Sequence, residues 1–159
     1  MKTQPKILEM ALPGGLDHSV MMRILGYNLA LASIPTTKLF NQHIGKVFKL
    51  RQVEFTIVSL LASNADVTTK QLSQALGVPA PNLTVVLDRL ESRGLLVRTR
   101  SETDRRVQYI SLSRTGAAMA KKACTCAEQM EKQVQAHLTP AESATLFELL
   151  KTLAVRGRQ

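Results

Sequence analysis

Residues 68–112 carry the pattern that most restricts the fold of this chain: two short helices around a tight turn. Thr68 and Gln71 have the spacing of a capping box, which satisfies free N–H groups where a helix begins. Gly77 is placed to end that helix, and Gly94 to end the next one. Between the two glycines, apolar residues recur at helical spacing: Leu83, Val86, Leu87 and Leu90. The pattern predicts a helix-turn-helix.

Two β-rich stretches follow. Residues 96–100 and 107–112 are rich in apolar and β-branched side chains, and residues 101–104 between them are polar, as in a hairpin tip. The expected fold is mainly α with a small β-wing: a winged helix-turn-helix with flanking N- and C-terminal helices that form a dimerisation region.

The chain is predicted to have four segments. Residues 1–15 form a flexible arm. Residues 17–50 form an N-terminal dimerisation helix that Pro35 bends or breaks, because proline removes a backbone donor and clashes with the preceding turn. Residues 51–113 are the DNA-binding domain, and residues 114–159 are C-terminal dimerisation helices.

The two C-terminal helices carry more apolar surface than one winged module can bury. Apolar stripes run from Met119 to Val134 and from Leu146 to Leu153. Pairing with a second copy of the chain would cover them, so a homodimer is expected.

Composition narrows the class of partner. Lys and Arg number 21 against 12 Asp and Glu, so the net charge is +9 and the pI is near 10.0. An anionic partner is therefore expected, either nucleic acid or an anionic membrane. Only 4% of residues are aromatic and Trp is absent, which argues for duplex rather than single strands. The sequence shows neither a signal peptide nor a membrane span, and a cytoplasmic location is expected.

Four motifs in succession resemble the MarR/SlyA family of bacterial winged-helix regulators: QLSQALGV at 71–78, LDRLESRGL at 87–95, TDRRV at 103–107 and ISLSRTG at 110–116. The resemblance extends over most of residues 17–155. It implies a dimeric, largely helical protein that binds a palindromic operator, often as a repressor. It also implies that a small molecule or an oxidant changes the operator affinity.

The second helix departs from the family pattern in its first turns. Pro79 and Pro81 stand where such proteins commonly carry hydroxyl side chains, and Val85 stands where Arg is frequent. Val85 can touch a thymine methyl group but cannot hydrogen bond to guanine. These departures leave the docking mode intact, but the family pattern does not specify the operator preference of this chain.

Asn82, Val85 and Arg89 are three to four residues apart, so they share the helix face opposite the buried leucines. They are predicted to enter a major groove together, while Thr84 on the flank meets a phosphate. The alternative is that all four form an ordinary solvated face.

The wing is unusually rich in arginine. Arg100, Arg105 and Arg106 are expected to contact DNA, and Asp104 to help orient the wing. The family resemblance implies that Asp88 pairs with Arg106 and leaves Arg105 free for the minor groove. The alternative is that these arginines are unpaired surface charges.

Four polar residues that interrupt apolar helices are the candidates for an effector pocket: His18, Tyr27, Asn28 and Arg51. Arg51 in a cavity would favour a carboxylate or another organic anion. The alternative is that these side chains are exposed or hydrogen bonded within the protein.

No cofactor, metal site or catalytic motif is predicted, so an enzyme is improbable. The leading hypothesis is a homodimeric, sequence-specific regulator of double-stranded DNA, a repressor relieved by a small anionic or aromatic ligand. One alternative is a DNA-coating protein without operator preference. Another is a redox-responsive regulator acting through Cys124, which is expected to lie off the apolar stripe that contains Cys126.

Overall fold

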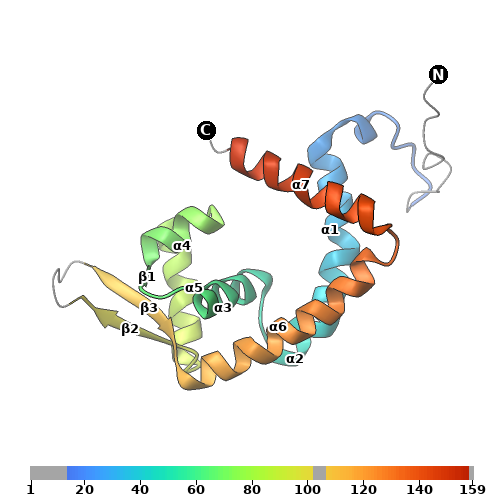
Figure 1. The fold of residues 1–159 in the computed structure, drawn as a ribbon. Coiled ribbons are helices and arrows are strands. Elements are labelled where there is room, and N and C mark those ends of the chain that lie inside the picture. The colour runs from blue at the N-terminus through green and yellow to red at the C-terminus, as the bar shows by residue number, and fades with distance from the viewer. Residues whose placement is uncertain (1–13, 102–106, 158–159) are drawn as a thin grey trace. The chain divides into compact units, whose positions relative to one another are not determined.

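The computed structural model describes residues 14–101 and 107–157. The chain divides into two compact units, residues 1–37 and 38–159, and each is described by itself. The described part of the first unit contains a 3-10 helix, η2 (Met21–Arg23), and most of helix α1 (Leu25–Phe40). Figure 1 shows the order of the elements along the chain.

Of the two outcomes predicted at Pro35, the break is wrong, because α1 is helical on both sides of this residue; the bend stays a prediction. Neighbouring hydroxyl groups add bonds to the helix: Ser33 donates to the carbonyl of Ala30 at 2.6 Å, and Thr36 donates to that of Ser33 at 3.0 Å. Proline removes one N–H bond and crowds the preceding turn, but the helix continues through the turns before and after it. The departure from α-helical geometry comes later, in the π-helix η3 (Asn41–Gly45).

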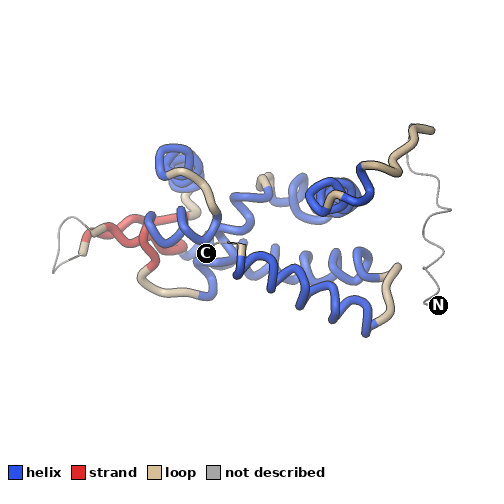
Figure 2. Tube along the Cα trace, turned by 90° about the horizontal axis from the view of Figure 1, so that it is seen from above, coloured by secondary structure: helices blue, strands red, loops and turns tan. Residues whose placement is uncertain are grey.

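The second unit contains the predicted winged helix-turn-helix. After η3 come α2 (Lys46–Phe48), α3 (Gln52–Ser63), β1 (Val67–Thr68), α4 (Thr69–Leu76), α5 (Ala80–Ser92), β2 (Leu96–Arg100), β3 (Gln108–Leu112), α6 (Arg114–Gln135) and α7 (Pro140–Arg156). Figure 2 shows the three strands side by side. The fold is mainly helical with a small antiparallel sheet.

The predicted ends of the two central helices are confirmed. The Thr68 hydroxyl accepts the Gln71 N–H at 3.2 Å, and Gln71 Oε1 accepts the Thr68 N–H at 2.8 Å. Gly77 ends α4 in the left-handed conformation at φ 63°, and Gly94 follows α5 at φ 68°. Only glycine adopts this conformation without steric cost.

The sheet has the order β1-β3-β2. Strands β2 and β3 form the predicted hairpin, with Leu96 opposite Leu112 and Arg100 opposite Gln108. No pattern in the sequence predicts β1, which is only two residues long and pairs Val67 with Ile110. This short strand joins the helix-turn-helix to the inner strand of the wing.

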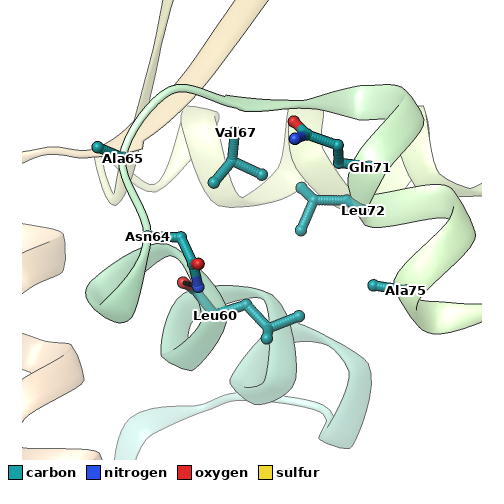
Figure 3. Close-up of a pocket in the computed structure, with 7 residues that line it drawn as sticks. All are labelled: Leu60, Asn64, Ala65, Val67, Gln71, Leu72 and Ala75. Atoms are coloured by element: carbon teal, nitrogen blue, oxygen red, sulfur yellow. Dashed lines mark hydrogen bonds between the residues drawn. The ribbon is translucent and has the colours of Figure 1, made fainter.

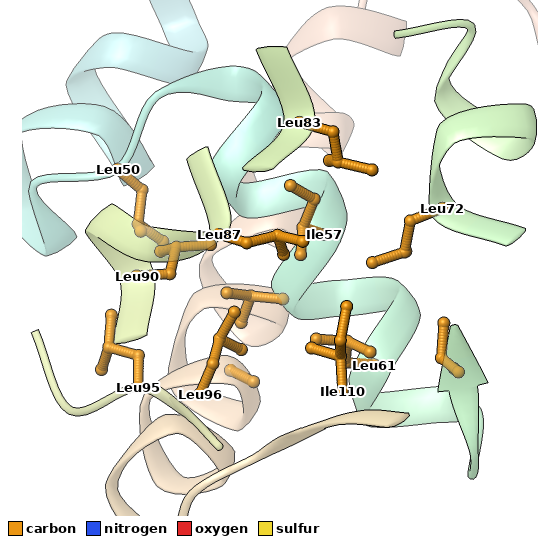
Figure 4. Packing of buried hydrophobic residues seen from close by; sticks show 13 residues of the cluster. Leu50, Ile57, Leu61, Leu72, Leu83, Leu87, Leu90, Leu95, Leu96 and Ile110 are labelled. Atoms are coloured by element: carbon orange, nitrogen blue, oxygen red, sulfur yellow. The ribbon is translucent and has the colours of Figure 1, made fainter. Parts of the chain in front are cut away.

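The core of the second unit lies between α3, α5 and the sheet. Figure 4 shows leucines and isoleucines from these elements pointing toward one another. The buried side chains include Leu50, Ile57, Leu61, Leu72, Leu83, Leu87, Leu90, Leu95, Leu96 and Ile110. Burying each such side chain stabilises the folded state by roughly 1.5–3 kcal/mol. Because the leucines of α5 are held in the core, the opposite face of this helix points to solvent.

Hydrogen bonds hold the start of α6 against the turn that follows α5. The Ser113 hydroxyl accepts the Gly116 N–H at 2.9 Å and donates to the Gly94 carbonyl at 2.6 Å. The Ser113 N–H donates to the Leu95 carbonyl at 3.0 Å. Gly116 packs against this same carbonyl: a Cβ atom added at Gly116 would lie 2.0 Å from the Leu95 oxygen. The position therefore accepts only glycine without a shift of the backbone.

Candidate nucleic-acid interface

Helix α5 presents the predicted groove-facing residues together. Asn82, Val85 and Arg89 are exposed, while Leu83 and Leu87 on the opposite face are buried. Val85 is 69% exposed, which leaves its methyl groups available for an apolar contact.

Thr84 is also exposed, but its hydroxyl is used within the helix. It donates to the carbonyl of Ala80 at 2.9 Å. Pro79 caps α5 without a side-chain hydrogen bond. Thr84, which the sequence predicts to contact a phosphate, therefore has its hydroxyl hydrogen engaged within α5.

Glu54 is the most unusual side chain near this surface, and sequence reasoning missed it. It is 1% exposed, yet it carries a carboxylate. Its Oε2 accepts the Arg51 N–H at 2.7 Å, and its Oε1 lies 3.2 Å from Nε of Arg89. Arg93 Nη1 is 4.0 Å from Oε2. A buried charge needs such partners, because burying it unpaired would cost several kcal/mol.

Arg93 extends this network to the segment before α3. Its guanidinium donates to the carbonyls of Phe48 and Lys49, both at 2.9 Å. Lys49 has a left-handed backbone at φ 53°. Glu54 and Arg93 together connect the loop before α3 to the C-terminal half of α5. The one sequence signal for Glu54 was its place three residues after Arg51, where a carboxylate caps a helix.

The wing strand β2 is tied to α5 by a second ion-pair network. Asp88 Oδ1 lies 2.6 Å from Arg98 Nη2, and Glu91 Oε2 lies 3.2 Å from Arg98 Nη1. Asp88 thus has a wing-orienting partner that the sequence analysis did not name. Its predicted partner, Arg106, lies outside the described residues.

Two other wing predictions, Arg105 and Asp104, also lie outside the described residues. Arg100 is described and is exposed at the end of β2. It lies on the strand that Arg98 ties to α5, so the two predicted DNA-contacting elements are held together by side-chain ion pairs.

The effector candidates in the first unit are bonded within that unit. His18 Nδ1 hydrogen bonds to the Tyr27 hydroxyl, and the buried His18 Nε2 has no partner among the described residues. The amide nitrogen of Asn28 donates to the carbonyls of Met22 and Ile24, both at 2.9 Å. Arg51 belongs to the second unit, where its side chain is exposed.

A cavity of about 210 Å³ lies between α3, β1 and α4. Figure 3 shows its lining, which consists of Leu60, Asn64, Ala65, Val67, Gln71, Leu72 and Ala75. None of the four predicted effector residues lines it. The lining carries no charged side chain, so this cavity does not suit the anionic ligand expected from the sequence.

Both cysteines are free thiols and half-buried on α6. Cys124 Sγ lies 3.7 Å from the Ser59 hydroxyl on α3, so Cys124 faces a neighbouring helix. The expectation that Cys124 lies away from the packed side of α6 is therefore wrong. The buried residues of α6 are Gly116, Ala120 and Ala123; the predicted apolar stripe included Ala123 but not Gly116 or Ala120.

Within residues 14–101 and 107–157, no group of three metal-binding side chains is close enough to hold an ion. Across the same ranges, no helix combines the length and the apolar character needed to span a membrane.

Comparison with known proteins gives a consistent result. The model of the MarR family matches residues 49–107, which include the helix-turn-helix. The chain is 31% identical over 114 residues to the homoprotocatechuate degradative operon repressor of Escherichia coli, covering 72% of this chain and 77% of that protein. It is also 31% identical over 140 residues to the organic hydroperoxide resistance transcriptional regulator of Bacillus subtilis, covering 86% and 94%.

Among solved structures, the fold is similar to the transcriptional repressor CouR bound to a 23-mer DNA duplex. The TM-score is 0.80 and the identity 31%, and the match covers 87% of this chain and 98% of that one. These similarities include the flanking helices as well as the DNA-binding elements.

Proposed function

Because the chain belongs to the MarR family of transcriptional regulators, we propose that it is a homodimeric repressor that binds a palindromic operator and is released by a small organic ligand. The family consists of DNA-binding regulators rather than enzymes. The observation that carries the proposal is the exposed face of α5, where Asn82, Val85 and Arg89 lie together beside the wing.

Charge and geometry support binding to duplex DNA. The net charge of +9 attracts the phosphate backbone, and a helix of 13 residues such as α5 fits the major groove. Arg98 holds β2 against α5, which supports a contact of Arg100 with the DNA backbone or minor groove next to α5. The structural relative CouR binds DNA with the same fold.

The exposed apolar side chains of α7 support a homodimer. Leu146, Phe147, Leu149 and Val155 are between 45% and 64% exposed. A single chain leaves this surface in water, and a second copy would bury it. A two-fold dimer carries two copies of α5, which meet half-sites about 10 base pairs apart on a palindrome.

The ligand is proposed to be a small organic anion. The Escherichia coli relative is named for the degradation of homoprotocatechuate, which is an aromatic acid. Within the first unit, the candidate contacts are the Tyr27 hydroxyl and His18 Nε2, which has no hydrogen-bond partner among the described residues. Arg51 in the second unit is a separate candidate. A regulator of this kind acts in the cytoplasm, where bacterial DNA is.

Fluorescence anisotropy tests the DNA part of the proposal. The dimer should bind a palindrome selected from random duplexes at least ~10³-fold more tightly than unrelated duplex at physiological salt. Equal affinity for both would support a DNA-coating protein and overturn the proposal. Light scattering should give twice 17.5 kDa, and a stable monomer would contradict the dimer.

A panel of aromatic carboxylates tests the ligand part. At least one should lower operator affinity in the wild type, with a weaker effect in Arg51→Ala and in His18→Ala. Release by hydroperoxide alone, abolished in Cys124→Ser, would instead favour the redox alternative. The hydroperoxide-resistance name of the Bacillus subtilis relative makes that comparison necessary.

A further inference from the structure

The exposed face of α5 offers few hydrogen-bonding groups to the edge of a base pair. The Thr84 hydroxyl is committed to the Ala80 carbonyl. Val85 is apolar and strongly exposed. Asn82 is exposed, and the described residues give its amide no hydrogen-bond partner. The Asn82 amide is therefore free to hydrogen bond to a base. The apolar side chain of Val85 lies about one helical turn away on the same face.

Arg89 lies on the same face and would ordinarily be the strongest reader, because arginine pairs with O6 and N7 of guanine. Here its Nε is 3.2 Å from a carboxylate oxygen of Glu54. Glu54 is almost completely buried, whereas Arg89 is close to half-exposed. The restraint therefore comes from the protein interior and acts on a side chain at the surface.

Glu54 cannot release Arg89 without loss of a charge partner. Arg93, the other cation nearby, is 4.0 Å from Glu54 and already donates to the carbonyls of Phe48 and Lys49. If Arg89 moved to a guanine, the buried carboxylate would keep only the Arg51 N–H at 2.7 Å and this longer contact. Leaving a buried charge with incomplete partners is strongly unfavourable.

On the basis of the proposed operator binding, we propose that α5 reads adenine and thymine and that Glu54 enforces this by holding Arg89 away from guanine. The Asn82 amide donates to N7 and accepts from the N6 amino group of adenine, and Val85 contacts a thymine methyl group. Glu54 is a positioning residue, because it acts on DNA only through Arg89.

The spacing of the two readers sets the spacing of the two bases. Asn82 and Val85 are three residues apart, which is a rise of about 4.5 Å along a helix. Base pairs in duplex DNA are stacked about 3.4 Å apart. The two readers therefore contact the same or adjacent A·T pairs within each half-site.

Selection from a random duplex library with the purified full-length dimer tests this inference. The wild type should select adjacent A·T pairs in each half-site. Asn82→Ala should lose discrimination at one of these pairs, by about 5-fold to 100-fold. Gln129→Ala, which removes an exposed amide on α6, should leave the selected site unchanged.

Two base analogues test the contacts of Val85 and Arg89 separately. Replacing thymine by uracil removes only the methyl group, so it should weaken wild-type binding several-fold and have no effect on Val85→Ala. Replacing guanine by 7-deazaguanine anywhere in the half-site should not weaken wild-type binding. A several-fold loss with 7-deazaguanine that disappears in Arg89→Ala would overturn the inference.

Glu54→Gln tests the positioning role directly. It removes the buried charge and should let Arg89 donate to O6 and N7 of guanine, so that guanine appears in the selected half-site. The double variant Glu54→Gln/Arg89→Ala should lose that guanine. A properly folded Glu54→Gln that selects the wild-type site would overturn the role of Glu54, and circular dichroism checks its folding. If this variant does not fold, the analogue measurements still decide the base preference.

The two proposals fail in different ways. Binding without any sequence preference would overturn the repressor function and this inference together. Specific binding that depends on guanine through Arg89 would overturn this inference alone.

Discussion

Gly116→Ala is the substitution for which the structure predicts the clearest effect on stability. Gly116 lies in the first turn of α6, against the Leu95 carbonyl. The added Cβ would be 2.0 Å from the Leu95 oxygen and 2.9 Å from its carbonyl carbon. Both neighbours are backbone atoms, so no side chain can rotate away to relieve the clash.

Two opposing terms determine the size of the effect. Alanine favours a helix over glycine by up to about 1 kcal/mol. Overpacking against a fixed backbone costs about 1–3 kcal/mol, and weakening the Gly116 N–H bond to Ser113 costs about 0.5–1.5 kcal/mol more. The net destabilisation is about 1–3 kcal/mol, because the steric term outweighs the gain in propensity.

Thermal unfolding followed by circular dichroism at fixed protein concentration measures this change. A loss of about 2 kcal/mol lowers the melting temperature by about 4–8 °C for a chain of this size. Gly26→Ala is the matched control, since Gly26 lies in α1 and an added Cβ meets nothing within 4 Å. The control should melt at the same or a higher temperature. An unchanged melting temperature for Gly116→Ala would refute the packing argument.

The remaining predictions concern the wing and the thiols. Asp88→Ala combined with Arg98→Ala should cost less DNA affinity than the sum of the single variants, and strict additivity would exclude the pair seen in the structure. The same cycle between Asp88 and Arg106, predicted from the family resemblance, should also be sub-additive. Arg105→Ala should weaken binding to all duplexes and flatten the salt dependence by about one unit of slope per lost phosphate contact, which titrations at several salt concentrations measure. Peroxide should leave operator affinity unchanged, whereas release that Cys124→Ser abolishes would show redox control.

Local signals in the sequence were sufficient for most of the second unit. The capping box at Thr68, the turn at Gly77 and the apolar and β-branched residues of β2 are local features, so the sequence alone reveals them. Strand β1 depends on pairing with a distant strand and has only two residues, too few for a periodic pattern. Continuity through Pro35 depends on the strength of the surrounding turns, which a rule based on proline alone does not include.

The side-chain partners near α5 were harder to predict for the same reason. Glu54 precedes Arg89 by 35 residues, and the pairing follows only when α3 and α5 pack together. In the same way, no sequence pattern indicated Arg98, which joins Asp88 to the wing strand β2. The sequence predicted which residues lie on the exposed face of α5, and the structure adds which of them have partners.

Hydroxyl-radical footprinting of the dimer on a selected operator tests the central claim most directly. The account predicts two protected segments related by two-fold symmetry and about 10 base pairs apart, with A·T pairs where α5 enters the groove. Asn82→Ala should weaken both segments equally, because both half-sites contact the same helix. Uniform protection along any duplex, independent of its sequence, would contradict an operator-reading repressor.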